Sequence, residues 1–177
     1  FSATSAGGGK QISLHAPAFS KTAAGEEIIV DMTFQNRTGS QNSLVFKDSN
    51  GKTVLNFDFI RAGSGSSTLA YVNDSGSLIK DTEYTYADNT WYRLIAVLNT
   101  VTLDYDFYMM NEDGLIIREY KNLKAIKGEW GATAPSNLNS FYMLMNDTAG
   151  ALTIQSVKVF SDPDFVLPQE HVSPEPS

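Results

Sequence analysis

The chain has 177 residues, enough for one domain with a two-layer core, and 42% of them are hydrophobic. Its net charge of −7 disfavours a nucleic-acid partner, because nucleic acid attracts basic surfaces. The absence of cysteine excludes disulfides, thiolate metal sites and cysteine nucleophiles. No apolar run reaches the roughly 18 residues that a membrane-spanning helix needs, so we expect no membrane partner.

The two ends of the chain differ in composition from its middle. Residues 1–9 are rich in Ser, Ala and Gly, and we expect a flexible leader there. Four of the six prolines fall in residues 163–177, which is typical of an interdomain linker or tail. The sequence therefore predicts one folded module over residues 10–162, cut from a longer multidomain chain.

Within this module the apolar residues recur with a period of two, which indicates strands that bury one face. In chain order the alternating runs are 28–34, 55–59, 91–98, 103–109 and 115–118. In a further run, 152–159, the apolar parity changes between Ile154 and Val157. A β-bulge at Gln155 and Ser156 would return the apolar side chains of that run to one face.

Short polar turns separate the runs. The strongest are Asp48–Gly51, Asn73–Gly76 and Asn111–Gly114, each with residues that tolerate a positive φ. Residues 62–67 read as a mobile loop, and no convincing helix of ten residues occurs. Many strands joined by polar turns predict an all-β fold, a two-sheet antiparallel β-sandwich of the jelly-roll type.

Three segments, taken together in their order and spacing, resemble a known family. They are Leu44–Gly51, the strand pair from Thr90 to Tyr108, and the closing strand Leu152–Phe160. They resemble the concanavalin A-like, laminin-G-like jelly rolls that accompany bacterial polysaccharide-degrading enzymes. The resemblance covers about residues 25–161.

The resemblance implies a carbohydrate-binding module that targets an attached enzyme to its substrate, secreted or held at the cell surface. Its partner would be a polysaccharide or oligosaccharide, and we expect a monomer tethered to other domains. Such modules often have an Asp where this chain has Gln155, and that Asp contributes to a structural calcium site. Calcium therefore stays open here, with other carboxylates as possible ligands: Asp31, Asp58, Asp162 and Asp164.

The catalytic members of this sandwich class carry a Glu-x-Asp-x-x-Glu motif on one strand, and this chain has none. Its nearest pair, Asp104 and Asp106, shares one strand face, which we interpret as a solvated surface. We therefore expect no enzyme activity. Two alternatives stay open: a structural or adhesive sandwich with a protein partner, and a small glycoside hydrolase or lyase.

A sugar site needs an exposed aromatic ring for stacking and planar polar side chains that hydrogen-bond the hydroxyls. Trp130 lies between glycines without apolar neighbours, so we predict a loop platform, and Trp130→Ala should weaken glycan binding. Trp91 opens a long amphipathic run, and we interpret it as core or sheet packing. The other candidate ligand-binding residues lie off the core pattern or beside the 62–67 loop: Tyr84, Tyr86, Arg61, Tyr71 and Tyr108.

Overall fold

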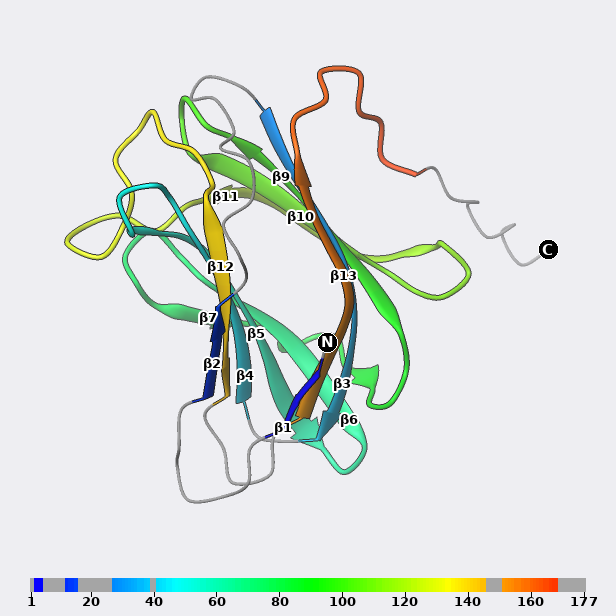
Figure 1. The fold of residues 1–177 in the computed structure, drawn as a ribbon. Coiled ribbons are helices and arrows are strands. Elements are labelled where there is room, and N and C mark those ends of the chain that lie inside the picture. Colours follow the sequence, from blue (N-terminus) through cyan, green and yellow to red (C-terminus); the bar gives the residue numbers. More distant parts are fainter. Residues whose placement is uncertain (1, 5–11, 16–26, 39–40, 146–150, 169–177) are drawn as a thin grey trace.

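The computed structural model describes residues 2–4, 12–15, 27–38, 41–145 and 151–168. These residues form two antiparallel sheets that pack face to face, and no helix occurs among them (Figure 1). No helix that could cross a bilayer is therefore found in the described parts of the chain. The predicted all-β, two-sheet jelly-roll sandwich is confirmed.

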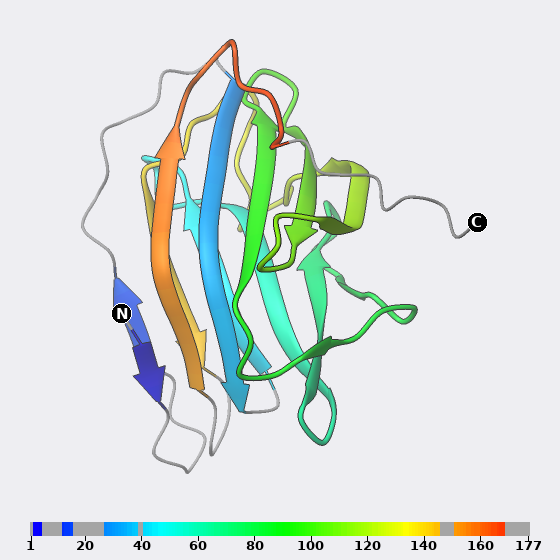
Figure 2. The same ribbon diagram turned by 90° about the vertical axis from the view of Figure 1, so that its right-hand side faces the viewer.

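The six-stranded sheet has the order β1-β13-β3-β9-β10-β11. Its strands are β1 (Ser2–Thr4), β13 (Ala151–Phe160), β3 (Glu27–Thr38), β9 (Tyr92–Asn99), β10 (Asp104–Met110) and β11 (Ile116–Lys124). Figure 2 shows this sheet from its outer side.

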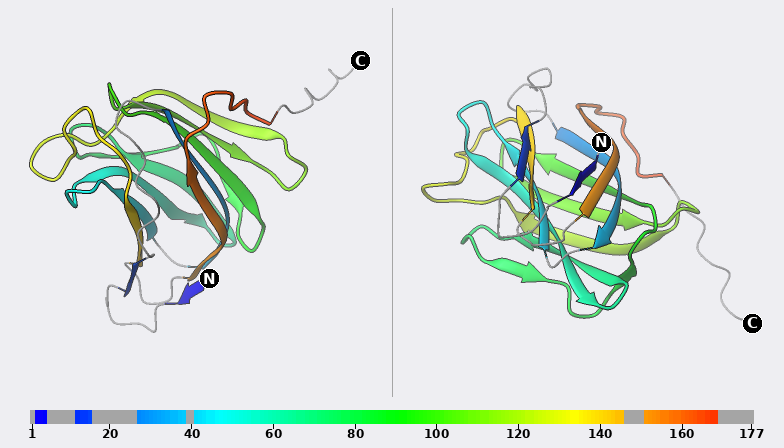
Figure 3. Two further views of the ribbon diagram at one scale, coloured as in Figure 1. Left: turned by 45° about the horizontal axis from the view of Figure 1, so that its top comes forward. Right: turned by 60° about the horizontal axis from the view of Figure 1, so that its bottom comes forward.

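The seven-stranded sheet has the order β2-β12-β4-β5-β6-β7, and the short β8 also pairs with β6. Its strands are β2 (Ile12–His15), β12 (Ser140–Met145), β4 (Gln41–Lys47), β5 (Thr53–Gly63), β6 (Ser66–Val72), β7 (Leu78–Lys80) and β8 (Tyr86–Ala87). Figure 3 shows both layers from two further directions.

Aromatic side chains from both sheets fill the space between the layers. Phe34 of β3 and Phe59 of β5 are fully buried, with ring centroids 4.6 Å apart. Phe107 of β10 stacks on Tyr120 at 4.2 Å and meets Phe57 at 5.0 Å. The alternating runs of the sequence therefore supply the core as predicted.

The predicted bulge in the last strand is confirmed. The register of β13 against β3 shifts between Ile154 and Ser156, and Gln155 between them is exposed. Residues on both sides of the shift, such as Ile154 and Val157, pack against the same core. The extra residue thus keeps the apolar face of β13 turned inward along its whole length.

The three predicted turns have one hydrogen-bond pattern. The side-chain oxygens of Asp48, Asn73 and Asn111 each accept backbone N–H groups two and four residues later. The glycine that ends each turn has a positive φ, for example 80° at Gly114, which L-residues rarely adopt.

Residues 62–67 do not form the loop expected from the sequence. β5 continues to Gly63, which pairs with Ser66 at the start of β6. The tight turn is possible because Gly65 takes a positive φ of 73°.

Two segments outside the expected module contribute to the fold. Ser2–Thr4, part of the expected flexible leader, forms β1 and pairs with the otherwise open edge of β13. After β13 the chain turns over the strand ends toward the outer face of the sheet (Figure 2). There Phe165 and Leu167 pack on an apolar cluster that includes Ile95. The rest of the leader and the tail from residue 169 lie outside the described residues.

An ion-pair network connects the two sheets at one edge. The carboxylate of Asp81, just after β7, accepts hydrogen bonds from Arg118 Nε at 2.8 Å and from the Tyr120 hydroxyl at 2.7 Å. Burial opposes ionisation of Asp81, but these hydrogen bonds and the Arg118 charge outweigh it and lower the pKa of the carboxyl. Because Arg118 and Tyr120 belong to β11, the network fixes the loop after β7 to the six-stranded sheet.

We expect Asp81→Asn to lower the free energy of unfolding at pH 7 by about 1.5–3 kcal/mol, the range for hydrogen bonds to charged groups. The folded-state pKa of Asp81 lies below its unfolded value of about 3.9, so the wild-type advantage is full above roughly pH 5. It is lost as the pH falls through the folded pKa. Urea denaturation at pH 7 and pH 3 measures this, and the difference in the free energy of unfolding between wild type and Asp81→Asn should be smaller at pH 3 than at pH 7.

The matched control for this prediction is Asp104→Asn. Asp104 is also paired, with Lys124 Nζ at 2.6 Å, but both side chains are exposed. Its replacement should leave the urea midpoint unchanged at either pH, because exposed pairs contribute little. An Asp81→Asn gap that stayed constant from pH 7 to pH 3 would show that its carboxylate charge is not the cause.

Candidate functional site

Trp130 lies in the segment between β11 and β12 and is 76% exposed. Its carbonyl oxygen accepts the N–H of Thr53 at 2.9 Å, which fixes this segment at the start of β5. The ring itself lines neither of the two described pockets. Its role as a platform stays a prediction.

Tyr84 and Tyr86, two of the predicted ligand-binding residues, lie in the β7–β8 region and are buried to different degrees. Tyr86 is 3% exposed, with its ring against Phe34 and Tyr92, so it offers no open face for stacking. Tyr84 is half-buried against the core, and the Arg118 guanidinium lies 5.8 Å from its ring centroid. Pairing of β8 with β6 directs Tyr86 inward, and the polar sequence around it gave no sign of this.

The remaining predicted residues are also dispersed. Tyr71 is half-buried and packs edge-on against Phe107 and Tyr120. Tyr108 points outward from β10 but is 5% exposed, because the Lys121 ammonium lies over its ring and donates to its hydroxyl at 3.0 Å. Arg61 is exposed in the β5–β6 hairpin and donates to the Gly63 carbonyl oxygen. The structure therefore does not gather the six predicted residues into one site.

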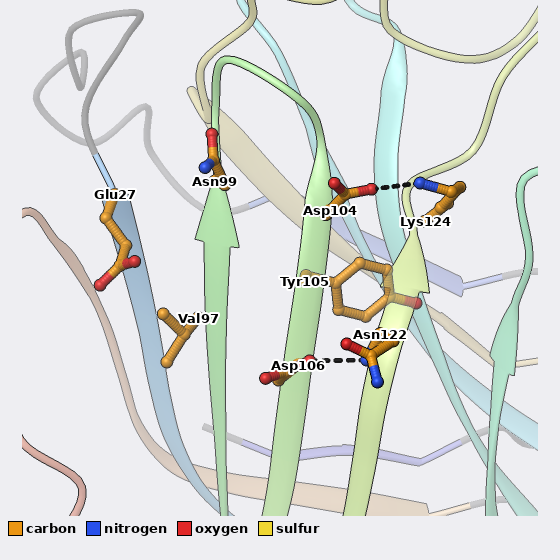
Figure 4. A pocket seen from close by; sticks show the side chains of 8 residues that line it. All are labelled: Glu27, Val97, Asn99, Asp104, Tyr105, Asp106, Asn122 and Lys124. Atoms are coloured by element: carbon orange, nitrogen blue, oxygen red, sulfur yellow. Dashed lines mark hydrogen bonds and ion pairs between the residues drawn. The ribbon is translucent and has the colours of Figure 1, made fainter.

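A polar pocket of about 450 Å³ lies at one end of the six-stranded sheet (Figure 4). It is lined by Glu27, Val97, Asn99, Asp104, Tyr105, Asp106, Asn122 and Lys124. Its one aromatic residue, Tyr105, is 3% exposed, so the pocket has no ring on which a sugar could stack.

The two aspartates of this pocket are not arranged as a catalytic pair. Asp104 is bonded to Lys124, and this hydrogen bond lowers the pKa of its carboxyl. Asp106 accepts the backbone N–H of Asn122 at 2.7 Å and lies 3.7 Å from Lys121 Nζ. A glycosidase acid needs a raised pKa, so these contacts favour a solvated surface over a catalytic role.

A second pocket, of about 390 Å³, lies at the other end of the same outer face, and we call it the Trp91 pocket. It is lined by Thr33, Trp91, Tyr92, Arg93, Met110, Asn111, Glu112, Gly114 and Gln155. Strand alternation explains its position: Tyr92 and Leu94 are buried in the core, so Trp91 and Arg93 point outward. The β10–β11 turn and the β13 bulge then add Glu112 and Gln155.

The polar groups of the Trp91 pocket are held in defined positions. Arg93 donates from Nε and Nη2 to both carboxylate oxygens of Asp31, at 2.8 and 2.7 Å, and this hydrogen bonding raises the pKa of Arg93. Glu112 and Gln155 are exposed, and Trp91 is half-buried. The pocket thus combines a partly exposed indole with a guanidinium, an amide and a carboxylate.

A sugar site needs a ring for stacking beside planar polar groups, and this pocket offers both at Trp91, a residue that we predicted to pack in the core or on the sheet. Trp91 shares its outward parity with Arg93 and Ile95, so its orientation was visible in the alternation. What the sequence does not display is that Gln155 and the Asn111–Gly114 turn lie beside it.

The position at which the resemblance implies calcium is occupied by Gln155, whose side chain is exposed at the bulge. Asp31 is held by Arg93, and Asp58 lies on the other sheet and accepts from Gln41. Among the described residues no three acidic or histidine side chains gather closely enough to hold a metal. Calcium therefore stays an open prediction, with an amide in place of the carboxylate at that position.

Comparison with known proteins finds no matching family model and no curated protein similar in sequence. Solved structures are similar in fold. One is a sialidase, with a TM-score of 0.61 and 12% identity over 92% of this chain and 15% of that chain. Another is the heptameric SAP-like pentraxin of Limulus polyphemus, with a TM-score of 0.52 and 12% identity over 88% of this chain and 74% of that chain. A tetrameric galectin from the ball sponge Cinachyrella sp. also matches, with a TM-score of 0.51 and 11% identity over 85% of this chain and 99% of that chain.

The similarity shows a shared fold. The chain spans only 15% of the sialidase chain, so the match concerns one part of that larger protein. The predicted jelly-roll architecture is thereby supported by independent structures.

Proposed function

We propose that this domain is a non-catalytic carbohydrate-binding module and that its sugar site is the Trp91 pocket. One observation carries the proposal: a partly exposed indole lines an open pocket together with Arg93, Glu112 and Gln155. Sugar rings present apolar C–H faces that stack on such a ring, and their hydroxyls pair with planar polar groups.

The dimensions and chemistry of the pocket agree with this role. Its volume of about 390 Å³ falls in the range of roughly 300–1,000 Å³ that is usual for small-molecule sites. Arg93 keeps N–H groups that Asp31 does not use, and Gln155 offers both a donor and an acceptor. Because the pocket is small and open to solvent, we expect dissociation constants of about 1 μM to 1 mM.

The module would act by targeting. Bound to a polysaccharide outside the cell, it would raise the local concentration of an attached polysaccharide-degrading enzyme at its substrate. The family resemblance supports this context, and so does the occurrence of the same fold as a small part of a sialidase chain. The paired states of Asp104 and Asp106 support a binding role over catalysis.

Affinity gel electrophoresis tests the proposal. Native gels containing neutral plant cell-wall polysaccharides, such as xyloglucan, β-glucan, xylan and galactomannan, should retard the protein in at least one case. A gel without polysaccharide and a non-binding reference protein serve as controls. A protein that is retarded in none of these gels and binds nothing on a glycan array would instead be a structural or adhesive sandwich.

A further inference from the structure

The charges at the Trp91 pocket do not balance. The charged residues that line it are Arg93 and Glu112. Arg93 is neutralised by its bidentate pair with Asp31. Glu112 is exposed at the β10–β11 turn, and its carboxylate takes part in none of the hydrogen bonds or ion pairs found among the described residues. The uncompensated charge at the pocket is therefore negative.

The rest of the outer face adds little net charge of either sign. Lys124 and Lys121 lie close to Asp104 and Asp106, at 2.6 and 3.7 Å, so their charges are largely cancelled. Elsewhere on this face the exposed residues without an ion pair in the described part of the chain are two glutamates, Glu27 and Glu119, and two cations, Arg37 and Lys158. The net charge of the whole chain is −7, so the protein as a whole repels anionic ligands, and at the pocket itself Glu112 is the unpaired charge.

We infer that the Trp91 pocket selects sugars by charge: it binds neutral or amino sugars and rejects sugars that carry a carboxylate, and Glu112 is the residue that discriminates. This inference rests on the proposed sugar-binding function. A hydroxyl or ammonium group of the ligand can donate to Glu112, whereas a ligand carboxylate beside Glu112 meets a like charge.

The expected size of the effect follows from the exposure of Glu112. Exposed charge pairs change binding by about two- to fivefold, and the change has opposite signs for ammonium and carboxylate ligands. The ratio of amino-sugar to acidic-sugar binding should therefore fall about fivefold or more in Glu112→Gln. It should also fall in wild type at 1 M salt, where the screening length is about 3 Å.

The test uses a printed array of neutral, amino-bearing and carboxylate-bearing glycans, probed with the wild-type protein, Trp91→Ala and Glu112→Gln. A signal counts only if Trp91→Ala reduces it. This criterion excludes signals that come from non-specific attraction of the acidic protein to basic glycans. Hits that are neutral or amino-bearing support the inference. Hits that carry carboxylates overturn it and leave the sugar-binding function intact, whereas an array without Trp91-dependent hits overturns the assignment of the site itself.

Glu119→Gln is the matched control, because Glu119 is an exposed glutamate of the same sheet that does not line the pocket. It removes the same formal charge and should leave the amino-to-acidic ratio close to that of wild type. If Glu119→Gln and Glu112→Gln shift the ratio equally, the selection comes from net charge and Glu112 has no specific role. If neither shifts it, charge does not select the ligand.

Discussion

Trp91→Ala is expected to weaken glycan binding by at least about tenfold, or ~1.4 kcal/mol, while the fold stays intact. The indole supplies the apolar surface of the pocket that a sugar ring can stack on, since Met110 beside it is 1% exposed. The fold should tolerate the change because the neighbours that hold the core, Tyr92 and Leu94, point the other way. Calorimetry with an oligosaccharide of the polysaccharide that retards the protein measures the loss, and thermal unfolding checks the fold.

Trp130→Ala is the natural comparison, since it removes the other indole of the chain, which is 76% exposed. The two tryptophans lie at opposite ends of the sandwich. Trp91 precedes Tyr92, whose ring contacts Phe34 near the end of β5. The carbonyl oxygen of Trp130 accepts the N–H of Thr53, the first residue of β5. If the Trp91 pocket is the site, Trp130→Ala should change the affinity little. A larger loss in Trp130→Ala than in Trp91→Ala would place the site at the loop end, as the sequence predicted.

The fold was predictable because each strand must bury one face, and a period of two records which face that is. Phe34, Phe57 and Phe107 all occupy core positions that their alternation indicated. The bulge at Gln155 was predictable for the same reason, since without it half of the apolar residues of β13 would face solvent. These features depend on neighbours within one strand, which the sequence displays directly.

The site was less predictable because it depends on which segments meet across the sheet. Alternation places Trp91 outward, but it does not tell whether the outward side is covered or open. On the same outer face Ile95 is covered by the segment after β13, while Trp91 lines an open pocket. Tyr86 shows the converse: its polar surroundings suggested exposure, yet pairing of β8 with β6 places its ring in the core.

Composition was an incomplete guide at the chain ends. A Ser/Ala/Gly-rich leader and a Pro-rich tail suggest loose chain, but strand pairing needs only backbone groups, so Ser2–Thr4 can extend the edge of β13. In the tail, Phe165 and Leu167 are apolar residues within range of an apolar face, and burial of that area favours their packing.

Phe107→Ala is expected to lower the free energy of unfolding by about 3–5 kcal/mol, the usual cost of deleting a buried aromatic ring. Phe107 is fully buried and joins both layers, because its ring contacts Tyr120 of β11, Phe57 of β5 and Tyr71 of β6. Total stabilities are only about 5–15 kcal/mol, so the loss should lower the unfolding midpoint by roughly 10 °C. Calorimetric or circular-dichroism melts measure it.

Phe165→Ala is the matched control for this loss. Phe165 is also a phenylalanine in contact with another ring, Phe160 at 5.9 Å, but it is half-buried on the outer face and outside the core between the sheets. Its removal should cost only about 1 kcal/mol, since less apolar area leaves water and no closed cavity forms. If Phe165→Ala destabilised the protein as much as Phe107→Ala, the segment after β13 would be an integral part of the core, and the aromatic contacts between the sheets would not dominate the stability.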